Sequence, residues 1–315
     1  MGRTTRDLDG RIITLIGGSG FFGTHLAQEL LSRGARLRIC SRHPEKAWRV
    51  KPLAGLGQVQ FGRVDVTRPE TVAAAVGGAD AVVYLAGSFS GDLDALQGKG
   101  AGRVAAAARD AGAKAYVHVS AIGADAGSSV GYARTKAEGE AAVLAAFPAA
   151  TVVRPSVLFA EDDDFVNMFA RLVAAFPVLP VFGPHAKLQP LFVDDAAEAV
   201  ANALADPGAH GGKTYEIAGP DVLTMHELNE RIAIAQGRKR ALIDLPDEIS
   251  ALIAALPGTP INRDQWALLK AGNVASGTHP GLAELGVKPR PLVLFLDRWM
   301  ARYRKHGRFG ERLAA

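Results

Sequence analysis

Three side chains suited to acid–base chemistry lie close together in the first half of the chain. Ser120 follows an apolar segment, 115–119, and Tyr132 and Lys136 are four residues apart in the sequence YARTK. If this sequence is helical, the phenol and the ammonium lie on one face of the helix. A lysine cation favours the phenolate, so it would lower the pKa of Tyr132 from its ordinary value near 10.

This set predicts hydride transfer to or from a carbonyl compound. Tyr132 would relay a proton to or from the carbonyl oxygen, Ser120 would hydrogen-bond to that oxygen, and a nicotinamide would carry the hydride. A Tyr-x-x-x-Lys pattern also arises by chance on exposed helices. The catalytic interpretation therefore depends on a nucleotide-binding sequence in the same chain.

A glycine-rich sequence of this kind follows the first predicted strand. Residues 16–23 read IGGSGFFG, which fits G-x-x-G-x-x-G from Gly17 or G-x-G-x-x-G from Gly18. Gly17 and Gly20 would allow a tight turn and a close approach of the backbone to a pyrophosphate, and Gly23 would let the helix pack on the strand. The alternative is a merely flexible turn between strand and helix.

The end of the second predicted strand distinguishes the two nicotinamide dinucleotides. An NAD site has an acidic residue there for the ribose 2′-hydroxyl. This chain has Cys40-Ser41-Arg42-His43 instead, with no acidic residue between Glu29 and Glu45. A guanidinium can pair with a 2′-phosphate, so Arg42 favours NADPH or NADP over NAD, unless it is simply a solvated surface arginine.

Further residues at predicted strand ends complete the expected cofactor site. Asp65 could accept a hydrogen bond from the adenine amine or could cap the next turn, and the residues from Leu85 to Gly87 offer close approach of the backbone. The predicted cofactor-binding residues are Gly17, Ser19, Gly20, Phe21, Phe22, Arg42, Asp65, Val66, Leu85, Ala86, Gly87, Tyr132, Lys136, Pro155 and Ser156. The predicted catalytic residues are Ser120, Tyr132 and Lys136.

The elements around these residues alternate as in an α/β protein. Predicted strands lie at 11–16, 37–40, 59–63, 81–85, 115–119 and 151–153, with alanine-rich helical segments between them. This order predicts a Rossmann-type, doubly wound parallel sheet with a smaller C-terminal α/β domain. We expect the dinucleotide-binding domain to span 1–158, with 188–207 returning to it, and the smaller domain to comprise 159–187 and 208–315. A helix is predicted at 193–205, and a capping box at Thr224-Met225-His226-Glu227 predicts another through Ile234.

Composition limits the class of protein. The 315 residues are 48% hydrophobic and 22% charged, as in an ordinary globular protein, and contain one cysteine, Cys40. That excludes an internal disulfide and a cysteine-built metal site, and it favours a cytoplasmic compartment. No apolar run reaches the 18 residues of a membrane-spanning helix, and the first residues lack a signal-peptide core.

Positive charge is concentrated at the C-terminal end. Residues 288–315 carry eight Lys or Arg and two acidic residues, a net +6, which leaves −2 for the rest of the +4 chain. The basic sequence pI is therefore no sign of nucleic-acid binding. Within this tail, Leu292, Phe295, Leu296, Trp299 and Tyr303 recur at helical spacing between basic residues. Such a helix suits an anionic membrane surface or an acidic partner, or it packs its apolar side on its own domain.

Two other polar features have structural interpretations. The acidic run from Glu161 to Asp164 is interpreted as the N-cap of a helix through Ala175, because no ligand pattern surrounds it, and we predict no metal site. His118 lies between two valines and is interpreted as a structural residue of a strand.

Together these motifs resemble those of the atypical short-chain dehydrogenase/reductase superfamily. More narrowly, the chain is similar to the accessory NADPH-binding subunit of respiratory complex I and its bacterial relatives. This likeness rests on His118-Val119-Ser120, YARTKAEGE from Tyr132, QPLFV from Gln189, INRDQ from Ile261 and PGLAELG from Pro280. The resemblance implies tightly held NADPH, chiefly structural, and a C-terminal domain that faces the quinone arm of the complex at the inner side of the respiratory membrane. The stretch 246–260 is shorter than in such relatives, so the resemblance implies no membrane-proximal contact there.

Overall fold

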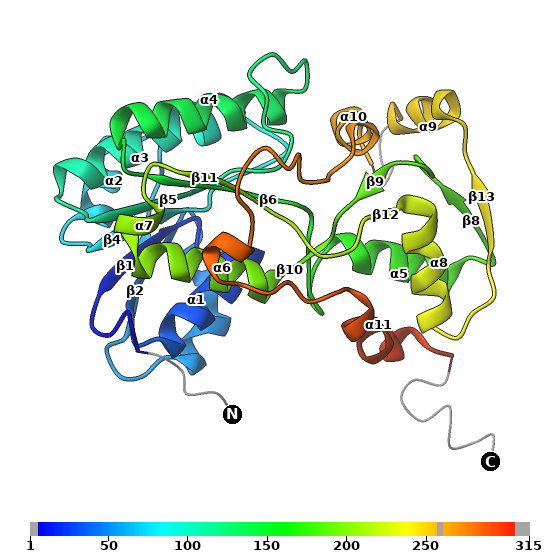
Figure 1. Ribbon diagram of the computed structural model, residues 1–315, viewed down its shortest axis with the longest axis horizontal. Coiled ribbons are helices and arrows are strands. Elements are labelled where there is room, and N and C mark those ends of the chain that lie inside the picture. The colour runs from blue at the N-terminus through cyan, green and yellow to red at the C-terminus, as the bar shows by residue number, and fades with distance from the viewer. Residues whose placement is uncertain (1–5, 257–260, 306–315) are drawn as a thin grey trace. The chain divides into compact units, whose positions relative to one another are not determined.

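The computed structural model describes residues 6–256 and 261–305, which form two compact units (Figure 1). The first unit contains the chain up to Pro155 together with Val193–Ile217 and Ser276–Lys288. The second contains Ser156–Phe192, Ala218–Ala275 and the chain from Pro289 onward. Compared with the expected boundaries, the first unit also includes 208–217 and 276–288, whereas 156–158 and 188–192 belong to the second unit.

A seven-stranded parallel sheet forms the centre of the first unit, with the strand order β3-β2-β1-β4-β5-β6-β11. Its strands are β1 (Ile12–Ile16), β2 (Arg36–Ser41), β3 (Val59–Arg63), β4 (Ala81–Tyr84), β5 (Ala115–Val119), β6 (Thr151–Pro155) and β11 (Thr214–Ile217). The predicted doubly wound fold is confirmed. Strand β11 was missed, because it lies within 208–315, which we expected to belong to the second domain.

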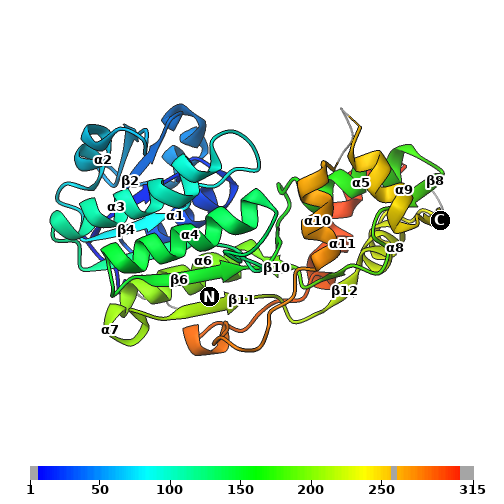
Figure 2. The ribbon, with the colours of Figure 1, turned by 90° about the horizontal axis from the view of Figure 1, so that it is seen from above.

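Helices cover both faces of this sheet (Figure 1). They are α1 (Phe21–Ser32), α2 (Pro69–Val76), α3 (Lys99–Asp110), α4 (Gly131–Ala146), α6 (Val193–Ala205) and the short α7 (Pro207–His210). Helices α2, α3 and α4 lie on one face and α1 and α6 on the other, and α3 and α4 run side by side (Figure 2). Small residues allow this close contact: a Cβ on Gly102 would lie 2.8 Å from that of Ala142.

An ion-pair network fixes β11 and the segment after Ala275 to the sheet. The Arg154 guanidinium on β6 donates to Glu140 of α4 at 2.6 and 2.9 Å and to Glu216 of β11 at 3.5 Å. The backbone N–H and hydroxyl of Ser276 both donate to Glu216 at 2.7 Å. Both glutamates are less than 8% exposed, so Arg154 compensates two buried carboxylates.

The second unit contains short strands in three two-stranded sheets, β10-β7, β12-β9 and β13-β8. Its elements are β7 (Leu158–Phe159), α5 (Phe165–Ala175), β8 (Val178–Val181), β9 (Lys187–Leu188), β10 (Leu191–Phe192), β12 (Leu223–Thr224), α8 (Met225–Ala235), β13 (Ala241–Asp244), α9 (Asp247–Ala254), α10 (Arg263–Ala271) and α11 (Val293–Met300). The predicted capping box at Thr224 is confirmed at the start of α8.

The tail helix α11 packs its apolar side within its own unit. Leu296 and Trp299 are buried, and the Phe295 ring stacks on Phe192 with the centroids 4.2 Å apart. Arg302 donates to the Glu161 carbonyl at 2.5 Å. Of the two interpretations of this helix, the structure therefore shows the one in which its apolar side is covered by its own domain. None of the helices in the described ranges is long and apolar enough to cross a membrane.

The acidic run caps α5, as expected, through Asp163. This carboxylate is 4% exposed and accepts from the N–H groups of Val166 at 2.6 Å and Ala160 at 3.0 Å. Asp164 makes no side-chain capping bond. Burial raises the pKa of Asp163 to about 6 against the lowering effect of these backbone bonds. Across the described residues, no group of three or more His, Cys, Asp or Glu side chains is arranged to hold a metal ion.

Candidate dinucleotide site and catalytic residues

The glycine loop between β1 and α1 is held by close backbone contacts. Gly17 has a φ of +85°, and a Cβ there would lie 2.8 Å from the backbone nitrogen of Ala86, just after β4. A Cβ on Gly23 would lie 2.6 Å from the Cα of Gly18. These two glycines are therefore required to fold the loop, which lies against the end of β4 and under the first turn of α1.

Gly20 differs from these two glycines because space remains beside it. Its nearest neighbour for an added Cβ is the Gly17 oxygen at 3.5 Å, an ordinary contact. Gly20 is the N-cap of α1, no side chain caps that end, and the first turn contains no acidic residue. The N–H groups of the first turn and the helix dipole are thus suited to an anion such as a pyrophosphate.

The end of β2 brings polar groups beside this loop. The Ser19 hydroxyl of the loop donates to the Ser41 hydroxyl at 2.8 Å, and the backbone N–H of His43 donates to the same oxygen at 3.1 Å. Arg42 follows β2 directly and is exposed. Nothing acidic occupies the strand end, so the residues present fit a dinucleotide with a 2′-phosphate.

Asp65 has a structural role in the first unit. Its carboxylate accepts from the hydroxyl of Thr67 at 2.7 Å and from its N–H at 3.0 Å, so it caps the turn that leads to α2. These bonds lower its pKa, and Arg42 adds a smaller effect in the same direction. This was one of the two interpretations of Asp65, and a contact with adenine remains a prediction.

The other predicted cofactor residues lie after β4, after β3 and at the end of β6, except Ser156, which belongs to the second unit. Leu85, Ala86 and Gly87 follow β4, where Gly87 lies next to Lys136: a Cβ there would be 3.3 Å from its Nζ. Val66 is buried after β3, and Pro155 ends β6. Ser156 belongs to the second unit, where its hydroxyl donates to the Gln189 carbonyl at 2.6 Å.

The predicted catalytic residues come from β5 and α4. Lys136 is 3% exposed, and its Nζ donates to the carbonyl of Val119, the last residue of β5, at 3.0 Å. The same Nζ lies 5.9 Å from the centre of the Tyr132 ring. Ser120 follows Val119, and its hydroxyl is buried without a hydrogen-bond partner among the described residues. That unsatisfied hydroxyl fits a role in binding a ligand oxygen.

Burial changes the acidity of both titratable groups. It lowers the pKa of Lys136 to about 8, against an opposing effect of Glu140, and raises the pKa of Tyr132 to about 12. The expected lowering of the tyrosine pKa by Lys136 is therefore not found, because burial of the phenol dominates. At neutral pH Tyr132 keeps its proton and can donate it.

Comparison with known proteins agrees with this geometry. A family model described as NAD(P)H-binding matches residues 17–169, and one described as RmlD substrate binding domain matches 125–279. The chain is 31% identical to NADH dehydrogenase [ubiquinone] 1 alpha subcomplex subunit 9 of Arabidopsis thaliana, over 95% of this chain and 80% of that protein. It belongs to the atypical short-chain dehydrogenase/reductase family, whose members bind NAD(P)H.

Two further comparisons concern an enzyme similar in sequence and a solved structure similar in fold. It is 30% identical to ceramide reductase of Caulobacter vibrioides, over 75% of this chain and 74% of that enzyme. Its fold matches the structure of triphenylmethane reductase of Citrobacter sp. complexed with NADP(H), with a TM-score of 0.74 and 22% identity, over 91% of this chain and 99% of that one.

Sequence reasoning missed two side chains of the candidate site. Gln97 is fully buried and donates to the Thr135 hydroxyl on α4 at 2.9 Å. Phe89 stacks on the Tyr132 ring. Neither belongs to a recognisable motif, and only the fold brings them to α4. His118 is a buried strand residue, as predicted, stacked on Tyr84, and burial and then Lys136 lower its pKa to about 3.

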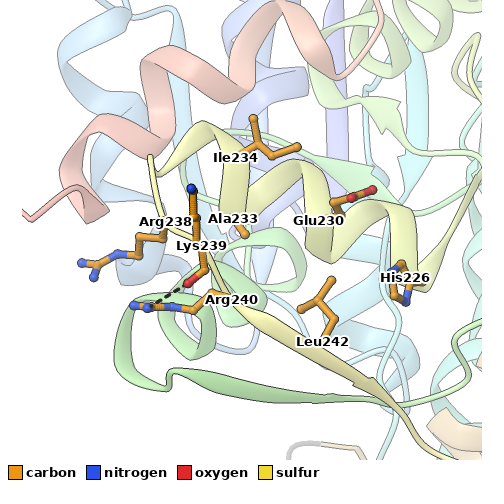
Figure 3. Close-up of a pocket in the computed structure, with 8 residues that line it drawn as sticks. All are labelled: His226, Glu230, Ala233, Ile234, Arg238, Lys239, Arg240 and Leu242. Carbon is orange, nitrogen blue, oxygen red and sulfur yellow. Dashed lines mark hydrogen bonds between the residues drawn. The ribbon is translucent and has the colours of Figure 1, made fainter.

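The second unit has a surface hollow that contains none of the predicted catalytic or cofactor-binding residues. The hollow measures about 380 Å³ and lies between α8 and β13. Figure 3 shows that its side chains do not converge: Arg238 and Arg240 point to one side, away from His226. Arg240 is already bonded to backbone carbonyls, including that of Val173 at 2.7 Å. We therefore place the candidate site in the first unit.

Proposed function

We propose that the protein holds NADP(H) in its first unit and acts as an accessory, stabilising component of a respiratory NADH:ubiquinone oxidoreductase. The observation that carries the cofactor choice is Arg42, exposed directly after β2 beside the bonded Ser19 and Ser41 hydroxyls. A guanidinium and hydroxyls there suit a 2′-phosphate, whereas NAD sites use a carboxylate at this place.

The accessory role is supported by a relative that matches along most of the chain. That protein is named as a subunit of NADH dehydrogenase [ubiquinone], and the match extends over 95% of this chain, well beyond the nucleotide loop. Such a role would make the protein a peripheral component at the inner face of the respiratory membrane. Lys305 and Arg298 of the basic tail would remain for contacts with acidic partner subunits or anionic lipid.

The residues that would hold the dinucleotide are those of the first unit. The first-turn amides of α1 would bind the pyrophosphate, Arg42 the 2′-phosphate, and Lys136 with Tyr132 the nicotinamide half. Asp65 with Val66 would border the adenine, and Leu85 to Gly87 with Pro155 would border the rest of the molecule. Bound NADPH supplies a hydride donor.

Two measurements test this proposal. The nucleotide released on denaturing the purified protein should be NADPH or NADP, and release of NAD alone would contradict the role of Arg42. Purification in mild detergent from the native host should yield the protein together with complex I subunits. Its consistent absence from that complex would contradict the accessory role.

A second candidate function is a free NADPH-dependent reductase of a carbonyl compound. The observation that favours it is the grouping of Ser120, Tyr132 and Lys136 around the end of β5, where the Ser120 hydroxyl has no partner within 6–256 and 261–305. The similarity to an enzyme named ceramide reductase adds lipids of the ceramide type to the small carbonyl and quinone compounds to be tested. NADPH oxidation with these compounds should be lost in Tyr132→Phe. Equal rates of NADPH oxidation in the wild type and Tyr132→Phe would contradict the reductase function.

A further inference from the structure

The candidate site contains an aromatic contact that neither proposed function uses. Phe89, from the loop after β4, stacks on Tyr132 with the ring centroids 4.4 Å apart and the ring planes at 21°. Phe89 is 48% exposed, so its ring lies between the phenol and solvent rather than in the core. An offset stack of this kind is a favourable aromatic arrangement.

Hydrogen bonds hold the loop on both sides of Phe89. The Ser88 hydroxyl donates to the Ser90 carbonyl at 2.8 Å and accepts from the Ser90 N–H at 3.1 Å, which turns the backbone tightly around Phe89. The Ser88 N–H donates to Gln97 at 3.3 Å, and Gln97 in turn donates to Thr135, about one turn beyond Tyr132 on α4. The same buried amide therefore connects the loop that carries Phe89 to the helix that carries Tyr132.

We propose that Phe89 is a specificity-determining residue whose ring forms a fixed wall over one face of the Tyr132 phenol. The role in substrate choice rests on the proposed reductase function, whereas the wall itself is a property of the protein without any ligand. A small carbonyl compound can approach the phenol beside the wall. A compound with a bulky group on that side is excluded.

The wall has a consequence for the phenol that can be measured without a cofactor. Burial raises the pKa of Tyr132 to about 12, from an ordinary value of 10. Tyr132 is partly exposed, so without the Phe89 ring more water would reach the phenol and its pKa would fall toward the ordinary value. Each unit of that fall increases the phenolate fraction about tenfold at a pH below both values.

Nitration by tetranitromethane tests the wall, because the reagent attacks the phenolate. In the full chain at pH 8, followed by peptide mass spectrometry, Tyr132 in Phe89→Ala should be nitrated at least about tenfold faster than in the wild type. Phe89→Trp, which retains a ring, should react at close to the wild-type rate. Phe176→Ala removes a similarly exposed ring (52%) from the second unit and should change nothing.

The folded state is checked in the same experiment. Tyr84 and Tyr116 are 0% and 1% exposed and should stay unmodified in every variant. Equal nitration rates of Tyr132 in Phe89→Ala and the wild type, with Tyr84 and Tyr116 unmodified, would show that the Phe89 ring does not shield the phenol.

Substrate choice is tested separately with NADPH and a pair of ketones, one small and one bulky. Phe89→Ala should raise kcat/KM for the bulky ketone relative to the small one by about tenfold. An unchanged ratio would overturn the specificity role. If neither protein reduces any carbonyl compound, the reductase function and the role in substrate choice both fail, while nitration still decides whether the ring shields the phenol.

Discussion

The glycine at position 23 tests how the nucleotide loop is built. A Cβ there would lie 2.6 Å from the Cα and the oxygen of Gly18, where ordinary contacts are 3.4–4 Å. Because the obstacle is backbone, α1 or the loop must move by about 1 Å, and overpacking of this kind costs about 1–3 kcal/mol. Taking the upper end and subtracting the gain of about 1 kcal/mol for alanine over glycine in a helix leaves a loss of about 2 kcal/mol for Gly23→Ala.

Gly20→Ala is the matched control, because its added Cβ would meet nothing closer than 3.5 Å and its φ of −78° suits alanine. Replacing glycine at an N-cap should cost less than about 1 kcal/mol. Urea unfolding without nucleotide should therefore separate the two variants. Titration calorimetry with NADPH should show a loss of affinity in both variants. In Gly20→Ala the added methyl group fills the space proposed for the pyrophosphate, and in Gly23→Ala the loop or α1 has moved.

Two results would refute this reasoning. Wild-type stability in Gly23→Ala would show that the loop does not depend on the close contact with Gly18. Unchanged NADPH affinity in a stable Gly20→Ala would show that the pyrophosphate does not lie at the start of α1.

Three further substitutions test the cofactor choice, the ion-pair network and the buried lysine. Arg42→Ala should weaken NADPH binding about 10- to 100-fold in calorimetry and leave NADH binding nearly unchanged, because only the 2′-phosphate loses a charged hydrogen bond. Equal losses of affinity for NADPH and NADH would contradict this role of Arg42. Arg154→Met should lower the free energy of unfolding by about 3–5 kcal/mol, because it removes the guanidinium that compensates two buried carboxylates. Arg109→Met, in an exposed pair, should cost less than about 1 kcal/mol. The pKa of Lys136 is about 8 in the folded protein and 10.5 for an ordinary lysine, so as the pH rises the folded state loses this proton before the unfolded state does. Between pH 8 and 10 the free energy of unfolding should therefore rise by roughly 2–3 kcal/mol relative to that of Lys136→Met. Parallel pH–stability curves for wild type and Lys136→Met would refute the buried-lysine assignment.

The central sheet could be predicted because its strands are short, buried and regularly spaced. All six predicted strands are present within two residues of their expected ends. The seventh, β11, contains the polar Glu216 and Thr214, which weakened its apolar pattern. Its place in the sheet depends on pairing with β6 and on the salt bridge from Arg154, and such long-range partners cannot be read from a local pattern.

The site was predictable where backbone geometry demands particular residues and unpredictable where packing decides. Gly17 and Gly23 are required by contacts that leave no space for a side chain, so their spacing is visible in the sequence. Phe89 and Gln97 reach α4 only through the fold. The tail helix shows the same limit, because its amphipathic pattern alone left open whether its apolar side meets its own domain, as the structure shows, or another surface.

The two candidate functions make different demands on Tyr132. A protein that only holds NADP(H) needs the phenol as a hydrogen-bond group, which a pKa of about 12 leaves intact. Oxidation of an alcohol would need the phenolate, present in only about one molecule in 10⁵ at pH 7 with such a pKa. Reduction of a carbonyl compound needs a proton donor, and the protonated phenol beside the Lys136 ammonium can serve as one. The electrostatics of the site therefore favour binding or reduction over oxidation, and both agree with a nicotinamide cofactor bound in its reduced form.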